Sequence, residues 1–228
     1  MGRHTFLSVL IFTLVFLAVA IFLPSGREPV PATGDVPWNV TVDKEGYSHV
    51  FGISVGRSTV NDVTNLIHEP SEVSMFVAAD GKRSVEVYFD RVVLGQFYAK
   101  VVLGVALDDA TLKAMYERGV RISSLAGGVR KVELYPDDLA RVNNAVVSSL
   151  TYLPSVNLDA ETIRKRFGEP AHRFKERKSG LEHWLYPAIG LDLVLNDKVK
   201  DVLVYVKPSE FEKLAAPLRS SADEIARP

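Results

Sequence analysis

Two pairs of adjacent acidic residues in this sequence could act as the general acid and the general base of a hydrolase. The pairs are Asp108-Asp109 and Asp137-Asp138. Both stand where helices are expected to begin, and a carboxylate at a helix start accepts backbone N–H groups and interacts favourably with the helix dipole. We therefore interpret both pairs as helix-capping residues and not as catalytic residues.

The remaining chemically capable residues match no catalytic or ligand motif. The serines lie in no Gly-x-Ser-x-Gly elbow, so the local sequence gives a serine hydrolase no support. His172 and His183 are eleven residues apart, which is not a metal-ligand spacing, and Gly127-Gly128 lacks the spacing of a phosphate-binding loop. The absence of cysteine excludes thiol nucleophiles, thiolate metal sites and disulfides. An enzyme is the least supported class, and we expect no metal and no cofactor.

A basic stretch from Arg164 to Lys178 is the candidate binding site. It holds seven cations against Glu169 and Glu176, a net charge of seven minus two, or +5, in a chain of net charge -1. Such a stretch binds an acidic partner surface or anionic lipid headgroups, or it is only a solvated surface. The seven cations are Arg164, Lys165, Arg166, Arg173, Lys175, Arg177 and Lys178.

The composition excludes nucleic acid as an expected partner. The 228 residues include 27 Lys and Arg against 28 Asp and Glu, so the chain lacks the overall basicity typical of nucleic-acid binding. About 190 residues follow the N-terminal segments, and that length is enough for a packed core.

The apolar segment from Phe6 to Leu23 indicates a transmembrane helix. Fourteen of its eighteen residues are Leu, Ile, Val or Phe, and none is charged. At 1.5 Å per residue it spans about 27 Å, close to the thickness of the hydrocarbon core. Arg3 and His4 before it predict a cytoplasmic N-terminus and a periplasmic body, by the positive-inside rule.

A cleaved signal peptide is the alternative for the same segment. Ala18-Val19-Ala20 has the small-x-small form that signal peptidase accepts, so cleavage near Ala20 would release the protein into the periplasm. Residues 24–37 then contain four prolines without apolar periodicity, which predicts an extended tether. After it, Trp38 to Val42 and Tyr47 to Ile53 alternate apolar and polar residues, which predicts a hairpin.

An internal similarity at a spacing of one hundred residues indicates a duplication. Thr59 opens one short helix that stops before Glu69-Pro70, and Asp159 opens another that stops before Glu169-Pro170. After each Glu-Pro come a strand, a turn and a second strand with a tyrosine, at residues 85–89 and 183–186. The order of elements is therefore expected to repeat.

Other elements are expected between and after the two copies. The pattern predicts a helix over residues 108–118, a strand over 129–134 and an amphipathic helix over 136–150, with Leu139, Val142, Val146 and Leu150 on one face. A second hairpin is expected from 190–195 and 199–206. The chain after Pro208 is expected to form a short helix and then a frayed polar tail.

The second copy resembles the BamE (SmpA/OmlA) domain. The resemblance rests on NLDAETIRKRFGEP, with its Gly168-x-Pro170 stop, on the Trp184-x-Tyr186 strand in GLEHWLY, and on Gly190-Leu191. Two such units in tandem resemble the β-lactamase inhibitor protein, in which helices cover one face of a sheet and the other face is open. This chain departs from the BamE family because it has no cysteine to carry a lipid.

The resemblance implies a fold and a class of function. The expected fold is α+β: an N-terminal transmembrane helix, then two tandem helix-helix-β-sheet units with helices on one face of an antiparallel sheet. The implied function is a non-catalytic protein-interaction module in the bacterial inner membrane and periplasm, which binds another envelope protein in envelope assembly or homeostasis. A lipid- or peptide-binding or inhibitory module is the alternative.

The expected divisions of the chain follow from the same patterns. They are residues 1–5 as a cytoplasmic end, 6–23 as the transmembrane helix, 24–37 as the linker, 38–107 as the first unit, 108–208 as the second unit and 209–228 as a C-terminal tail.

Overall fold

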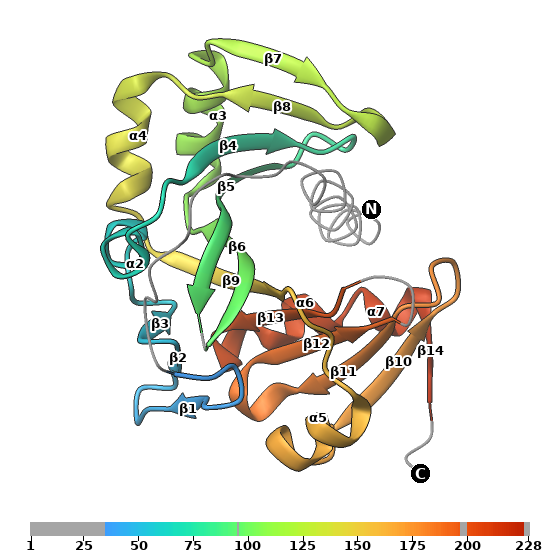
Figure 1. Ribbon diagram of the computed structural model, residues 1–228. Helices are drawn as coiled ribbons and strands as arrows, with labels where there is room; N and C mark the ends of the chain where they lie inside the picture. Colours follow the sequence, from blue (N-terminus) through green and yellow to red (C-terminus); the bar gives the residue numbers. More distant parts are fainter. Residues whose placement is uncertain (1–34, 95, 197–199, 226–228) are drawn as a thin grey trace.

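One antiparallel sheet of eleven strands organises the computed structural model, which describes residues 35–94, 96–196 and 200–225 (Figure 1). The strand order is β14-β10-β11-β12-β13-β9-β6-β5-β4-β8-β7. The strands are β4 (Glu72–Val77), β5 (Arg83–Leu94), β6 (Phe97–Val105), β7 (Arg121–Ser124), β8 (Arg130–Glu133), β9 (Val147–Pro154), β10 (His172–Glu176), β11 (Glu182–Tyr186), β12 (Leu191–Leu195), β13 (Val202–Val206) and β14 (Ala222–Glu224).

Short helices and a small second sheet complete the fold. The second sheet has three antiparallel strands, β1 (Thr41–Val42), β2 (Ser48–Val50) and β3 (Ile53–Val55). The helices are α2 (Val60–Ile67), α3 (Asp109–Glu117), α4 (Pro136–Asn143), α5 (Ala160–Phe167), α6 (Phe211–Ala215) and α7 (Leu218–Ser221), with short 3-10 turns η1 (Ala126–Gly128), η2 (Pro187–Ile189) and η3 (Pro208–Glu210).

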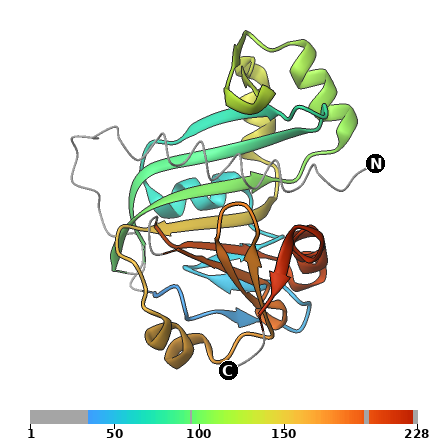
Figure 2. The ribbon, with the colours of Figure 1, turned by 90° about the vertical axis from the view of Figure 1, so that its right-hand side faces the viewer.

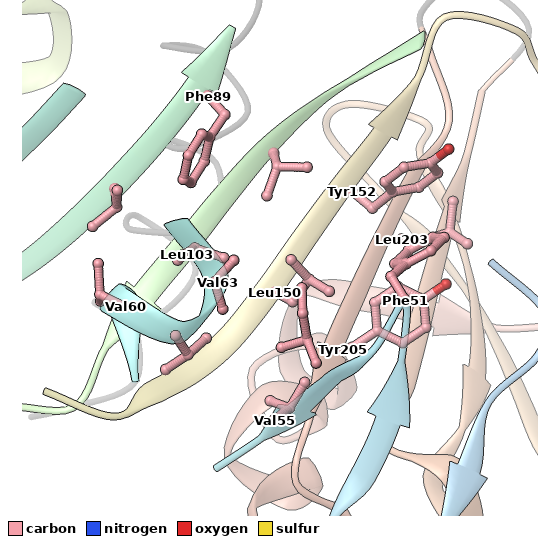
Figure 3. Close-up of a cluster of buried hydrophobic side chains, with 14 of the residues drawn as sticks. Phe51, Val55, Val60, Val63, Phe89, Leu103, Leu150, Tyr152, Leu203 and Tyr205 are labelled. Atoms are coloured by element: carbon pink, nitrogen blue, oxygen red, sulfur yellow. The ribbon is translucent and has the colours of Figure 1, made fainter. Parts of the chain in front are cut away.

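The larger core lies on the face of the sheet covered by α2 to α5 and by the small sheet. Every second residue of a strand points to this face, and its aromatic and aliphatic side chains form one continuous cluster. Figure 3 shows the centre of the cluster, where Phe51 from the small sheet lies between Tyr152 of β9 and Tyr205 of β13. The ring centroids of Phe51 and Tyr152 are 4.8 Å apart. The small sheet is therefore fixed to the large one by aromatic packing.

A second core lies on the opposite face, over one half of the sheet. There the alternate residues of β10 to β13 are also apolar, and Phe211, Leu214 and Leu218 of α6 and α7 pack on them. Figure 2 shows both helices, in red, against the strands of the second half. Helices therefore cover both faces of this half, which corrects the expectation that they lie on one face only.

The fold-class prediction of two tandem units is also wrong. Strand β9 pairs with β6 of the first half and with β13 of the second, so the two halves share a single continuous sheet. Tyr152 in β9 is aligned with Val101 on one side and with Leu203 on the other. The pattern of the two copies gave no information on how their sheets would join, because that joining depends on pairing between distant strands.

The predicted helix starts are confirmed at three positions. The Thr59 side chain accepts the Asp62 N–H, and the Asp62 carboxylate accepts the Thr59 N–H, so α2 begins with a capping box. Asp159 caps α5 and Asp108 caps α3, each through the backbone N–H three residues later. The strands predicted at residues 85–89 and 183–186 are present within β5 and β11.

Asp138 is an exception to the predicted capping roles. Helix α4 begins at Pro136 without a side-chain cap, and Asp138 is 3% exposed inside its first turn. Its carboxylate accepts two hydrogen bonds from the Arg118 guanidinium, at 2.6 and 3.3 Å. Asp138 therefore ties α4 to the end of α3.

The amphipathic helix predicted over residues 136–150 is wrong in its second half. Helix α4 stops at Asn143, and the chain continues as strand β9 from Val147. Asn143, Asn144 and the β-branched pair Val146-Val147 favour a helix end followed by a strand. Leu150 reaches the core from a strand and not from a helix.

The frayed tail predicted after Pro208 is also wrong. Helices α6 and α7 pack on the sheet, and β14 adds a strand beside β10. The apolar spacing of Phe211, Leu214 and Leu218 is that of one helix face, and it accounts for this packing.

The predicted membrane segment, Phe6 to Leu23, and residues 24–34 of the predicted linker lie outside the described residues. Within the described ranges no helix is long and apolar enough to cross a membrane. The longest described helix has nine residues, whereas a span needs about 20. The described residues therefore give the prediction of a single-pass, membrane-anchored protein no support.

Candidate functional site

A pocket lies on the sheet face that carries α6, between that helix and the strands in the middle of the sheet. Its volume is about 300 Å³, and it lies between β5, β6, β9, β13 and α6. Most of its floor is aliphatic or small, from Val102, Gly104, Thr151, Val204, Val206 and Leu214. Pockets of this size and character hold apolar groups.

Gly104 lines the pocket without a side chain, which leaves the pocket deeper at this position. A Cβ atom at this position would lie 2.3 Å from the Ser149 hydroxyl oxygen, which is far closer than van der Waals contact. The register between β6 and β9 shifts directly after Gly104. The side chains of Ser148 and Ser149 on β9 therefore occupy the space that a Cβ atom at position 104 would take.

The rim of the pocket is charged. Glu210 and Lys213 line it from η3 and α6, and they form an ion pair with each other. Phe211 and Leu214, which are buried against the sheet, hold this turn of the chain in place. The rim therefore presents polar groups around an apolar floor.

The same sheet face continues beyond the pocket toward β4. Glu86 and Val102 line both the pocket and a shallow neighbouring depression that also contains Tyr88. The Tyr88 hydroxyl donates to Asp90 at 2.6 Å, and Lys100 donates to the same carboxylate at 2.8 Å. Burial, together with Asp90, raises the pKa of Tyr88, so the phenol stays protonated.

The structure distributes the seven predicted cations over α5, β10 and the turn after β10, and the four arginines among them have partners. Arg164 and Arg173 lie over the Trp184 ring at 4.9 and 5.0 Å from its centroid, and Arg166 lies 4.9 Å from that of Trp38.

Three of these arginines form ion pairs that lower the local charge. Arg173 donates to Glu182 at 2.9 Å, and Arg177 donates to Asp223 of β14 at 2.8 Å. Arg164 Nε lies 3.5 Å from Glu169. The lysines of the stretch are exposed and form no ion pair with any described residue; they are Lys165, Lys175 and Lys178. Since the acids of β11 and β14 offset two of the arginines, the local charge bias is smaller than the sequence indicates.

A buried chain of charged groups lies behind these cations, on the face under α6 and α7. His183 is fully buried, and its Nδ1 lies 2.9 Å from Asp192 Oδ2, while its Nε2 lies 3.5 Å from Glu176 Oε1. The two carboxylates come from the neighbouring strands β10 and β12.

The charges of this chain stabilise one another. Burial disfavours a charged imidazole, but Asp192 and Glu176 outweigh it and raise the pKa of His183 to about 10. His183 in turn lowers the pKa of Glu176, to which Ser179 also donates a hydrogen bond. The chain is therefore a protonated histidine between two carboxylates.

The other predicted candidates are separate from one another. His172 is exposed and contacts Glu224 of β14 at 3.0 Å, at the edge of the sheet. Gly127-Gly128 belongs to η1, beside β8. The sequence predicted none of the pocket residues, since they come from four strands, the turn η3 and helix α6, which only the fold brings together.

Comparison with known proteins gives no relative. No family model matches the chain, and no curated protein and no solved structure matches it either. The resemblance to the BamE domain therefore stays a prediction.

Proposed function

We propose that the protein is an interaction module, and that a partner protein inserts an apolar side chain into the pocket beside α6, which is a binding and not a catalytic site. The observation that supports this most is the combination of an aliphatic floor, a low point at Gly104 and a charged rim. Buried apolar anchors surrounded by polar contacts are the usual arrangement of energetic centres in protein interfaces.

The size of the pocket selects the occupant. A volume of about 300 Å³ accepts one or two large side chains, such as Phe, Leu or Met, and is small for a whole lipid chain with its headgroup. Glu210 and Lys213 offer one charge of each sign to the polar neighbours of that anchor. We therefore expect a partner segment with one apolar anchor between polar residues.

Site-specific photo-crosslinking in intact cells tests this proposal. A photoreactive residue replaces Ser84 or Lys213 at the pocket, and Ser124 on β7 serves as the distant control. We expect the same adduct from both pocket positions and not from Ser124, with the attached peptide carrying an apolar residue at the crosslink.

A variant that fills the pocket gives the second arm. Ser149→Phe places a ring over Gly104 and should abolish the adduct at Lys213, whereas Ser124→Phe should leave it unchanged. An adduct that survives in Ser149→Phe, with the fold intact by circular dichroism, would overturn the proposal. A bound lipid in native mass spectra of the full chain would instead favour the lipid-binding alternative. An envelope partner and a periplasmic location stay predictions of the sequence.

A further inference from the structure

The outer face of the small sheet brings together a serine, a histidine and an aspartate. Strands β2 and β3 form a hairpin in which His49 and Ser54 are directly opposite each other. Their side chains point away from the core, to which the alternate residues Val50, Ile53 and Val55 belong. The pairing therefore fixes the imidazole and the hydroxyl side by side on an accessible surface.

The turn of this hairpin is unusually well fixed. It consists of Phe51 and Gly52, both with positive φ, at 55° and 79°. Two positive φ values define the two-residue turn that best matches the twist of a hairpin. A phenylalanine in this conformation is strained, and burial of its ring against Tyr152 offsets the strain. The core thus holds the register that places His49 opposite Ser54.

The three side chains form a continuous hydrogen-bonded chain. The Ser54 hydroxyl lies 2.7 Å from Nδ1 of His49, and Nε2 of His49 lies 3.0 Å from Oδ2 of Asp43. If the Asp43 carboxylate accepts from Nε2–H, then Nδ1 is unprotonated and accepts the Ser54 proton. This is the order of roles in a nucleophile–base–carboxylate triad.

Asp43 is held in position independently of the histidine. Its Oδ1 accepts the backbone N–H groups of Glu45 and Tyr47 at 2.9 and 3.0 Å. The Tyr47 N–H, followed by the contacts with His49, Glu45 and Arg57, outweighs desolvation and lowers the pKa of Asp43 to about 2. The carboxylate is therefore ionised and fixed, as an orienting group must be.

We propose that Ser54 is a nucleophile toward activated acyl esters, with His49 as its general base and Asp43 as the residue that positions the base. Ser54 Oγ bonds to the acyl carbon while its proton passes to His49 Nδ1. The bond to the leaving oxygen then breaks, and that oxygen takes the proton from His49. Water hydrolyses the acyl-serine by the same route, which regenerates the hydroxyl and releases the acid.

The surroundings of Ser54 limit the class of substrate. The Ser54 N–H donates to Ser58 at 3.0 Å and the Gly56 N–H donates to Val147 O at 2.8 Å, so these flanking amides do not form an oxyanion hole. The guanidinium of Arg57 lies 3.5 Å from Asp43 and also forms an ion pair with Glu45. A general base contributes roughly 10²–10⁴-fold and an oxyanion donor roughly 10²–10³-fold. We therefore expect aryl esters to react and amides not to react.

Covalent labelling of the full chain with a fluorophosphonate tests the proposal directly. We expect one adduct, mapped by mass spectrometry to Ser54, that is absent in Ser54→Ala and present in the control Ser124→Ala. His49→Gln and Asp43→Asn should each retain the fold and label at least tenfold more slowly. Hydrolysis of p-nitrophenyl acetate should be lost in Ser54→Ala and should be at least tenfold slower in His49→Gln and in Asp43→Asn.

Two results would overturn the inference. One is the absence of an adduct at Ser54 under conditions that label an active serine esterase. The other is an unchanged labelling rate in folded His49→Gln, which would show that the imidazole only stabilises the hairpin. Neither result concerns the pocket beside α6, which lies on the opposite face of the large sheet. The binding function proposed for the pocket and the nucleophile proposed at Ser54 are therefore tested independently.

Discussion

Removing the charge of His183 should destabilise the protein more than any surface substitution. In His183→Leu, Asp192 is left fully buried without its counter-charge. Breaking a buried ion pair by removing one partner costs about 3–5 kcal/mol. The pKa of His183 gives a similar figure, because its rise from 6.5 to about 10 corresponds to about 5 kcal/mol at most. We therefore expect a loss of about 3–5 kcal/mol in the free energy of unfolding near pH 6.

The pH dependence has a definite sign. The pKa of His183 is raised in the folded state, so its contribution is complete below pH 6.5 and is lost as the pH rises toward 10. The pKa of Glu176 is lowered, so its contribution is lost as the pH falls below 4.5. From these groups alone, stability should be greatest between about pH 4.5 and 6.5.

Urea unfolding of the full chain at a series of pH values measures both effects. In His183→Leu the decline between pH 6.5 and 10 should disappear, and His172→Gln, at an exposed pair, should change stability by less than about 1 kcal/mol. The double variant His183→Leu/Asp192→Leu should recover part of the loss, since it removes both charges. If His183→Leu loses less than about 1 kcal/mol in the free energy of unfolding and keeps the wild-type pH dependence, the buried ion pair does not stabilise the protein as expected.

Three further predictions concern the fold. Thr59→Ala removes the capping box of α2 and should cost about 1 kcal/mol in thermal unfolding, with no loss in the circular dichroism of the folded state. Gly104→Ala should lower the melting temperature because of its clash with Ser149, and Gly104→Ala/Ser149→Ala should restore most of it. Tyr205→Phe should cost about 1–3 kcal/mol in urea unfolding, since the buried carbonyl of Pro37 loses its donor at 2.8 Å.

Local features of the fold were predictable from the sequence. The caps at Thr59, Asp108 and Asp159 and the strands at residues 85–89 and 183–186 depend on side chains and turns close in the chain. Short-range hydrogen bonds and alternation of apolar residues determine such elements. These features are therefore visible in a single sequence.

Long-range pairing was not predictable in the same way. Val146 and Leu150 fit a helix face as well as a strand, and only the pairing of β9 with β6 and β13 decides between them. The same limit applies to the sites. His49 and Ser54 become neighbours only through the register of the hairpin, and the pocket needs strands from both halves of the chain. The basic stretch was visible as composition, but the acids of β14 that offset it are distant in sequence.

The position of β9 has a consequence for synthesis on the ribosome. Strand β6 is complete at Val105, yet its partner begins only at Val147, after α3, β7, β8 and α4 have been made. During that interval β6 presents an unpaired edge, which is the kind of surface that aggregates. The pairing of β9 closes this edge and opens its own other side to β13. During synthesis, the unpaired edge of the first half is therefore β6 until β9 is made, and then β9 until β13 is made.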